Sequence, residues 1–229
     1  MIALFGLMTS CQQQESSLRI MSYNIRNLRG MDDVRNVGRV AKVINEAKPD
    51  VVAVQEVDSV TGRSEQTDVL GLLATETQMY PTYAAAIDYD GGKYGVGILS
   101  REEPLSYYSI PLPGREEQRV LLVVEFDHYL FACTHLSLTE EDRLRSLPLL
   151  NQEAAKANKP LFIAGDWNAT PNSSFIGELR QSFTLLSDPG QLTFPADTPN
   201  RTLDYVAIYR TKDLAVNVKS TQVVDEPMA

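Results

Sequence analysis

The chain has 229 residues, 43% of them hydrophobic and 22% charged, which excludes a disordered or fibrous protein. It carries 30 aspartates and glutamates against 21 lysines and arginines, a formal net charge of −9. This charge counts against general coating of DNA, which depends on Lys and Arg, but leaves open a nuclease with a locally basic cleft. No apolar run reaches the roughly 18 residues that a membrane-spanning helix needs.

Residues 1–17 are predicted to be a leader with a polar tether, and residues 18–229 a single domain. Cys11 follows the apolar residues 1–8 and the small pair Thr9-Ser10, and it leads into the polar residues 12–17. This order resembles a bacterial lipoprotein signal, in which the cysteine becomes the lipidated first residue. It implies a membrane anchor at Cys11 and a place in the bacterial cell envelope, facing the periplasm or the outside. A frayed apolar N-terminus on a secreted or cytoplasmic protein is the alternative.

The first half of the domain alternates predicted strands and helices. The first strand is expected over residues 18–25, and apolar residues at helical spacing predict a helix over 34–47, ended by Pro49. Residues 51–54 are continuously apolar and rich in valine, a pattern typical of a strand buried on both faces. The next elements are a helix over 68–77 and a strand over 96–99.

The second half is richer in strands. A hairpin is predicted over 120–134, and Cys133 inside it is expected to be an inert core thiol. A capping box at 137–140 predicts a helix that ends near Asn158 and is interrupted at Pro148. Further strands are expected over residues 161–164, 203–208 and 215–218. Because strands outnumber helices and several follow one another without a crossover helix, we predict an α/β layered sandwich with mixed sheets, not a doubly wound parallel sheet.

Polar side chains stand where the predicted strands begin or end. These residues are Asn24, Glu56, His135, Asp166 with Asn168, and Asp204. At such a position a side chain can leave the packed sheet and face a cleft on a rigid support. Each alone has an ordinary explanation, such as a turn cap, a solvated carboxylate or a hydrogen-bonded structural histidine. Five such exits together are difficult to explain by packing, and we interpret them as one site.

The residue types of this site narrow its chemistry. Carboxylate and amide oxygens without clustered Cys or His suit Mg²⁺, and also Mn²⁺ or Ca²⁺, better than structural zinc. Glu56 is the natural metal ligand, with Asn24 beside it. Asp166 could take a proton from an attacking water, and Asn168 could orient that water or a phosphate oxygen. The sequence has no acyl-transfer elbow and no phosphate-cradling glycine loop, so phosphoester hydrolysis is the reaction that these residues fit.

Six motifs that include these residues occur in order along nearly the whole chain from Leu18. They are Ser22-Tyr23-Asn24-Ile25, residues 50–56, residues 94–100, Thr134-His135-Leu136, residues 165–171 and Leu203-Asp204-Tyr205. Together they resemble the endonuclease/exonuclease/phosphatase superfamily, which includes deoxyribonucleases, apurinic endonucleases, inositol polyphosphate 5-phosphatases and neutral sphingomyelinases. The resemblance implies a four-layered α/β sandwich with the site at one edge of two packed sheets.

The resemblance also implies a role for each matching residue. Glu56 would bind the catalytic metal with support from Asn24, and His135 would be the first of two catalytic histidines. Asp166 and Asn168 match the pair that activates water and holds the phosphate. Arg119 stands where family members often carry a substrate-side arginine; a solvated surface arginine is the alternative. Asp204 matches the aspartate that orients the second histidine.

That second histidine belongs to a closing Ser-Asp-His motif, which the sequence lacks before it stops at residues 225–229. His128, at the predicted hairpin turn, is a poor substitute. We therefore expect either a fragment of an active enzyme or a member that has lost one part of the mechanism, and the abrupt ending favours the fragment.

The expected partner is a phosphoester substrate, small or lipid-derived, and the protein is expected to be a monomer. The negative charge and the lack of a long basic loop weigh against DNA or RNA, although a nuclease is an alternative. A catalytically impaired phosphate-binding protein of the same fold is the second alternative. Trp167 could stack on a base or sugar of the substrate, or could pack in the core.

Overall fold

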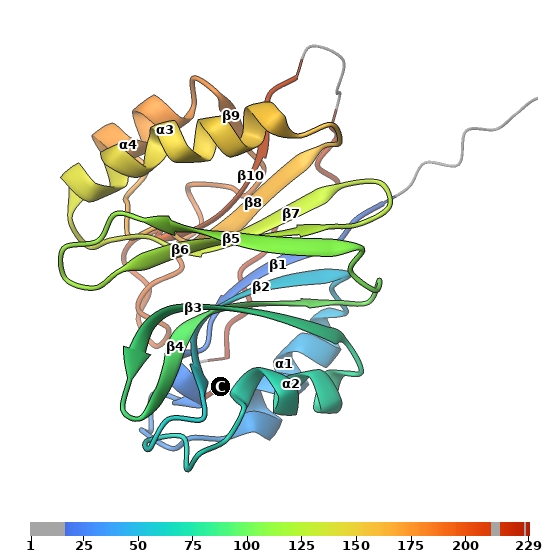
Figure 1. The fold of residues 1–229 in the computed structure, drawn as a ribbon, viewed down its shortest axis with the longest axis vertical. Coiled ribbons are helices and arrows are strands. Elements are labelled where there is room, and N and C mark those ends of the chain that lie inside the picture. The colour runs from blue at the N-terminus through green and yellow to red at the C-terminus, as the bar shows by residue number, and fades with distance from the viewer. Residues whose placement is uncertain (1–16, 212–215, 227) are drawn as a thin grey trace, which may run out of the picture.

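The computed structural model describes residues 17–211, 216–226 and 228–229. Two β-sheets lie face to face, with helices on both outer faces (Figure 1). The first sheet has four strands in the order β1 (Ile20–Asn24), β2 (Val51–Ser59), β4 (Gly92–Ser100) and β3 (Tyr80–Tyr89). The second has six, in the order β5 (Ser106–Leu112), β6 (Arg119–Glu125), β7 (Leu130–His135), β8 (Leu161–Asp166), β10 (Asp204–Tyr209) and β9 (Phe183–Leu185).

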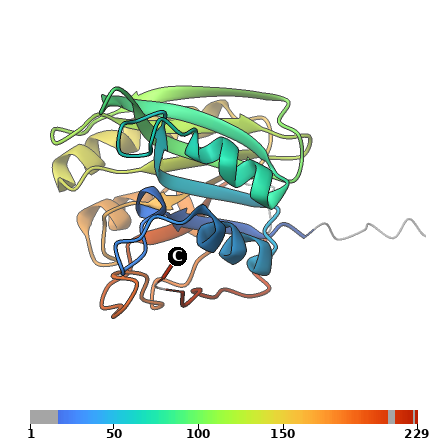
Figure 2. The ribbon, with the colours of Figure 1, turned by 90° about the horizontal axis from the view of Figure 1, so that it is seen from below.

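Helices α1 (Val37–Ala47) and α2 (Val69–Thr77) cover the first sheet and lie side by side, as Figures 1 and 2 show. Helices α3 (Glu140–Lys156) and α4 (Ser174–Leu179) cover the second. Both sheets are mixed, because β1–β2 and β7–β8 are parallel and the other pairs are antiparallel. The predicted four-layered sandwich is confirmed. Within the described ranges, no helix combines the length and the apolar character needed to cross a membrane.

Three apolar cores follow from the alternation of side chains along the central strands. Val51 and Ala53 of β2 pack between the sheets, whereas Val52 and Val54 pack against α1 and α2. In β6, Leu122 likewise faces the space between the sheets, and its neighbours on either side face α3 and α4. Because successive side chains point to opposite faces, a strand between two covered faces is apolar at every position. This explains the continuous apolar runs in the sequence.

Several predicted boundaries are wrong for local reasons. Helix α1 begins at Val37 because the side chain of Asn36 accepts a hydrogen bond from the Arg39 N–H and caps it. The predicted capping box is not formed, since the N-cap of α3 is Thr139 and Ser137 instead donates to a glutamate of the β5–β6 loop. Helix α3 also runs through Pro148 without interruption.

Other elements were absent from the prediction or do not form. The unpredicted ones are β3, β5, β9, α4 and a short 3₁₀ turn at Arg26–Leu28. Strands β3 and β5 are edge strands that expose much of their length, and each contains a proline, which an edge tolerates. The strand predicted over 215–218 is wrong for 216–218, which are irregular, and residue 215 lies outside the described residues.

Candidate active site

The predicted site residues meet at one edge of the two sheets. His135 ends β7 and Asp166 ends β8, and the two are register partners in a parallel pair. Asp204 opens β10, which runs antiparallel to β8, and is paired with Asp166 from the other side. Three strands of the second sheet therefore place His135, Asp166 and Asp204 side by side.

One amide joins the two sheets at this edge. The Nδ2 atom of Asn24, at the end of β1, donates to Glu56 Oε1 at 2.9 Å and to Asp166 Oδ2 at 3.1 Å. The Asn24 Oδ1 atom accepts a hydrogen bond from the Arg26 N–H at 3.0 Å, which fixes the direction of the amide. These contacts span 32 and 142 residues of sequence. Asn24 thus orients both carboxylates.

Glu56 leaves the strand ladder through a bulge. The pairing of β2 with β4 shifts register between Val54 and Val57, and Glu56 has a φ of 59° inside that shift. A bulge of this kind re-aims one side chain of a strand, here out of the buried sheet. Its neighbour Gln55 stays fully buried and donates to the Sγ atom of Cys133 at 3.4 Å. Cys133 is buried as predicted, and burial raises the pKa of its thiol to about 12.

Asp166 is held by several neighbours. Its Oδ1 atom accepts a hydrogen bond from the Asn168 N–H at 2.9 Å, and its Oδ2 atom lies 3.8 Å from Nε2 of His135. Asn168 has a φ of 49°, a conformation that asparagine tolerates, and its amide donates to the Leu136 carbonyl at 2.9 Å. The side chain of His135 is 11% exposed. The loops after β7 and β8 are therefore tied together around the Asp166 carboxylate.

The site has an excess of negative charge. Burial, together with the charge of Asp166, raises the pKa of Asp204 to about 8. Among the described residues, neither Glu56 nor Asp166 forms an ion pair with a lysine or arginine. Neighbouring carboxylates disfavour each other's charged form, and a positive charge placed near them would favour it.

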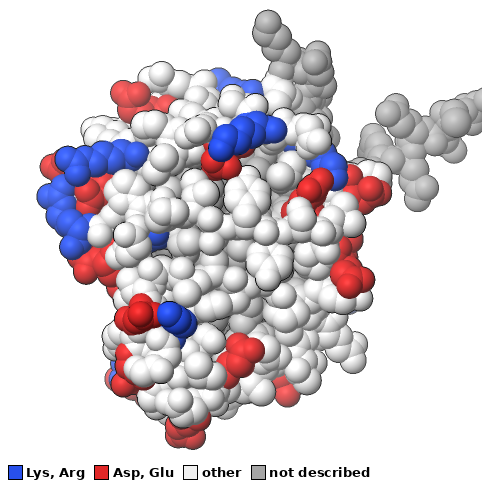
Figure 3. All heavy atoms as spheres, viewed as in Figure 1, with Lys and Arg blue, Asp and Glu red and all other residues white. Residues whose placement is uncertain are grey.

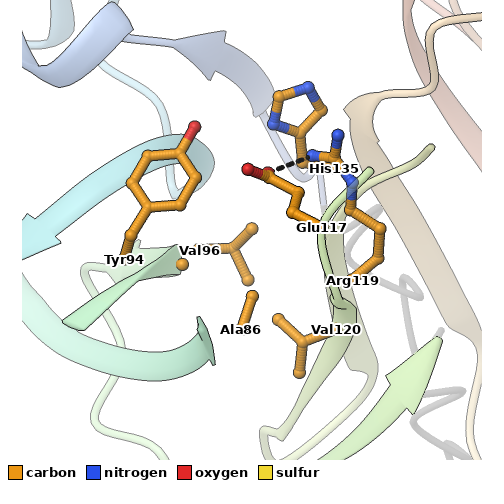
Figure 4. Close-up of a pocket in the computed structure, with 8 residues that line it drawn as sticks. Ala86, Tyr94, Val96, Glu117, Arg119, Val120 and His135 are labelled. Carbon is orange, nitrogen blue, oxygen red and sulfur yellow. Dashed lines mark ion pairs between the residues drawn. The ribbon is translucent and has the colours of Figure 1, made fainter. Parts of the chain in front are cut away.

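Arg119 lies next to this cluster and is not the solvated arginine of the alternative interpretation. Its side chain is 5% exposed, with Nη1 2.8 Å from Glu117 Oε1 and Nη2 3.1 Å from Glu116 Oε1. Its buried Nε atom has no hydrogen-bond partner in the described structure. Together with Tyr94, Glu117 and His135 it lines a pocket of about 10 Å³, room for roughly one water molecule (Figure 4). Tyr94 comes from the first sheet, and the other three come from the second sheet and the loop before it.

A sequence model of the Endonuclease/Exonuclease/phosphatase family matches residues 21–227. The chain belongs to this family. No curated protein sequence matches the chain. Family members are metal-dependent phosphoesterases and nucleases. The match spans all six motifs on which the resemblance rested.

Solved structures of the family share the fold. One is an endonuclease/exonuclease/phosphatase from Beutenbergia cavernae, with 23% identity and a TM-score of 0.71 over 84% of this chain and 64% of that one, less than two thirds of its length. A mannosyl-6-phosphatase of Bacteroides thetaiotaomicron has 15% identity and a TM-score of 0.65 over 84% and 85%. The human Nocturnin catalytic domain, solved with a bound sulfate anion, has 18% identity and a TM-score of 0.63 over 84% and 83%. At these identities the likeness concerns the fold.

The residues present fit the divalent metal on which the family depends. Magnesium usually takes one or two protein carboxylates and completes its shell with waters and substrate phosphate oxygens. Glu56 and Asp166 supply such oxygens and lack a compensating cation, as described above. No group of three or more His, Cys, Asp or Glu side chains converges on a metal position in the described ranges, so the fit is to this sparse, water-rich type of site. Metal coordination by Glu56 and Asn24 stays a prediction.

The remaining candidates are placed as follows. Trp167 is fully buried, stacked on Tyr205 at 4.9 Å between ring centres, so the suggestion that it stacks on substrate is wrong. His128 lies on the exposed turn between β6 and β7. Cys11 lies outside the described residues. Two residues of the site were missed from the sequence, Tyr94 and Glu117. The signal for Tyr94 was available, because it opens one of the six motifs.

Proposed function

We propose that the chain is a divalent-metal-dependent phosphoesterase acting on a small or lipid-derived phosphoester. The observation that carries this proposal is the Asn24 amide, which binds the carboxylates of both Glu56 and Asp166, with Asp166 Oδ2 3.8 Å from Nε2 of His135. A metal ligand, a proton acceptor and a proton donor are thereby gathered on the strands of the two sheets, as hydrolysis of a phosphoester requires.

Each group has a distinct task in this proposal. A metal held at Glu56 would supply positive charge to the phosphate oxygens. Asp166 accepts a proton from the attacking water, and its bond from the Asn168 N–H keeps the carboxylate in place. His135 donates a hydrogen bond to a phosphoryl oxygen as negative charge develops there. The water oxygen forms the new bond to phosphorus, the bond to the leaving oxygen breaks, and that oxygen takes up a proton from solvent water.

The charges around the site favour a substrate with little negative charge of its own. The carboxylates of Glu56 and Asp166 lie at this edge without a paired lysine or arginine, whereas Arg119 is already paired with Glu116 and Glu117. On the face shown in Figure 3, charged groups lie mostly around the rim, and the basic groups gathered at its left edge are mixed with acidic ones, whereas a nucleic-acid backbone needs a basic area. A sugar phosphate or a phospholipid head group meets this condition better than DNA or RNA.

The test is hydrolysis of a substrate panel with Mg²⁺: a generic phosphodiester, a sugar phosphate, sphingomyelin, an inositol polyphosphate and duplex DNA. We expect turnover of a substrate with one phosphate group, abolished by EDTA and lowered about 10²–10⁴-fold by Glu56→Gln or Asp166→Asn. The matched control is Lys159→Ala, which breaks an ion pair with Glu125 at the opposite end of β8 from Asp166.

Three other outcomes would change the conclusion. Cleavage of DNA alone would make the protein a nuclease. Tight binding of phosphate by calorimetry with no turnover would favour the phosphate-binding alternative. Activity that survives EDTA, or the double variant Glu56→Ala with Asp166→Ala, would rule out metal-dependent hydrolysis at this site.

We also propose that Cys11 carries a lipid and holds the protein in the bacterial cell envelope. The sequence order around Cys11 supports this, and such a location gives access to phospholipid head groups. Expression in a bacterial host should place the protein in the membrane fraction, and Cys11→Ser should release it. Recovery of a wholly soluble protein that retains Met1 would disprove the anchor.

A further inference from the structure

In the loop between β2 and α2, Arg63 forms an ion pair with the buried carboxylate of Asp58. The Nε and Nη2 atoms of Arg63 donate to Oδ2 and Oδ1 of Asp58, both at 2.7 Å, and the Asp58 side chain is 0% exposed. The Thr61 hydroxyl donates to the same carboxylate at 3.1 Å. Two parallel hydrogen bonds fix the plane of a guanidinium as well as its position. The guanidinium group of Arg63 therefore has a fixed position and orientation.

Arg63 and its loop also contact the hairpin of β3 and β4. The N–H groups of Gly62 and Arg63 donate to the carbonyl and the carboxylate of Asp90 at 2.8 and 2.6 Å. The Arg63 guanidinium carbon lies 4.3 Å from the ring centre of Tyr89 and 5.3 Å from that of Tyr94. Contacts of this length between a guanidinium and an aromatic face are attractive. The loop thus holds both tyrosines in fixed positions.

Tyr94 connects this arrangement to the active site. It is the register partner of Asp58, one residue from the bulge that contains Glu56. Its ring lines the pocket opposite Glu117 and His135 (Figure 4). Burial and the nearby Glu56 and Glu117 carboxylates raise its pKa, so its hydroxyl keeps its proton and can donate a hydrogen bond.

We propose that Arg63 is a positioning residue of the phosphoesterase site, acting through Tyr94, whose hydroxyl donates a hydrogen bond to an oxygen of the bound phosphoester. This inference rests on the proposed function. If Arg63 only joined the loop to the sheet, its contacts with Asp58 and Asp90 would be sufficient. The guanidinium also lies against the ring of a residue that faces His135 across the pocket. Arg63 therefore determines where the hydroxyl of Tyr94 lies.

A double-mutant cycle tests this coupling. Tyr94→Phe removes the hydroxyl. Arg63→Lys keeps the positive charge but loses the two parallel hydrogen bonds to Asp58 and the planar group that lies against the tyrosine rings. We expect each single variant to lower kcat/KM about tenfold, and the double variant to be no worse than Tyr94→Phe alone. A product of the two effects, about a hundredfold, would show that Arg63 acts independently of Tyr94 and would overturn the inference. Arg63→Met with Asp58→Asn removes the ion pair without leaving a buried charge unpaired, and it should lose as much activity as Arg63→Lys.

A second readout does not depend on turnover. With fluorotyrosine incorporated, the ¹⁹F resonance of Tyr94 is the one that Tyr94→Phe removes. We expect it to move in Arg63→Lys and to stay in place in Lys159→Ala, and an unmoved resonance in Arg63→Lys would overturn the inference. If the wild-type protein hydrolyses no phosphoester, the proposed function fails. The cycle is then measured on the affinity for inorganic phosphate with Mg²⁺, with the same criterion of coupling against additivity.

Discussion

Replacing Asp204 by asparagine tests the electrostatics of the active-site carboxylates. In the folded protein burial and the charge of Asp166 raise the pKa of Asp204 from 3.8 to about 8. Between these values the folded protein keeps a proton that the unfolded chain has lost. Its stability is therefore fully present below about pH 4 and declines as the pH rises towards 8. At about 1.36 kcal/mol per pH unit, the whole interval corresponds to roughly 6 kcal/mol of unfolding free energy.

Asparagine does not titrate, so Asp204→Asn should remove this decline. Urea unfolding with EDTA at pH 5, 6, 7 and 8 should show the variant gaining on the wild type by about 1 kcal/mol per pH unit. Asp166→Asn is the control for the charge itself. It removes the neighbouring carboxylate and should give a shallower pH dependence, because burial alone then acts on Asp204. Parallel pH curves for the wild type and Asp204→Asn would show that Asp204 ionises at an ordinary pKa, and would refute the reasoning.

Three further predictions concern the supporting structure. Burial alone would raise the pKa of Glu116, but its hydrogen bonds hold that pKa at about 2. Glu116→Gln should therefore lower the free energy of unfolding by roughly 1–2 kcal/mol at pH 7. In urea titrations this difference should shrink as the pH falls from 4.5 to 2. A Cβ on Gly165 would lie 1.9 Å from the Thr134 carbonyl oxygen, so Gly165→Ala should lower the Tm measured by calorimetry by about 6–12 °C. A Cβ on Gly177 in α4 would have no atom within 4 Å, so Gly177→Ala should raise the Tm by about 2–4 °C. Trp167, the single tryptophan and fully buried, should emit in the blue and resist acrylamide quenching with or without substrate, and a quench on substrate binding would contradict its place in the core.

The sandwich could be predicted because its central strands are covered on both faces. Val51 to Val54 alternate between two cores, so no polar residue interrupts them and the run is visible in the sequence. Strands β3 and β5 lie at the sheet edges, where exposure and the prolines Pro81 and Pro111 remove that signal. The capping box predicted at 137–140 does not form because of a contact between residues far apart in the sequence. The Ser137 hydroxyl donates to a glutamate that lies 21 residues away.

The site could be predicted where residues end a recognisable strand, and could not where they depend on loop packing. Asn24 and Asp166 stand at such ends, whereas the strand predicted to end before Glu56 continues to Ser59 and Glu56 lies at a bulge inside it. Trp167 shows the limit of proximity in sequence. It directly follows Asp166, yet consecutive side chains of an extended chain point to opposite sides, so one faces the site and the other the core. The ion pairs of Arg119 arise from the β5–β6 loop and have no sequence pattern of their own.

The distribution of charge at the site is the basis for the substrate class that we propose. Arg119 is neutralised by Glu116 and Glu117, so it adds no net positive charge at the pocket that it lines. Glu56 and Asp166 together repel any anion until a cation lies between them and the phosphate. A divalent ion held here would offset these two carboxylates and leave little positive charge for additional phosphates of a substrate. A nucleic acid or an inositol polyphosphate brings several more negative charges close to the same carboxylates. An ester with a single phosphate on an uncharged or cationic partner would bring one phosphate group to the metal, and this is why we propose it as the substrate.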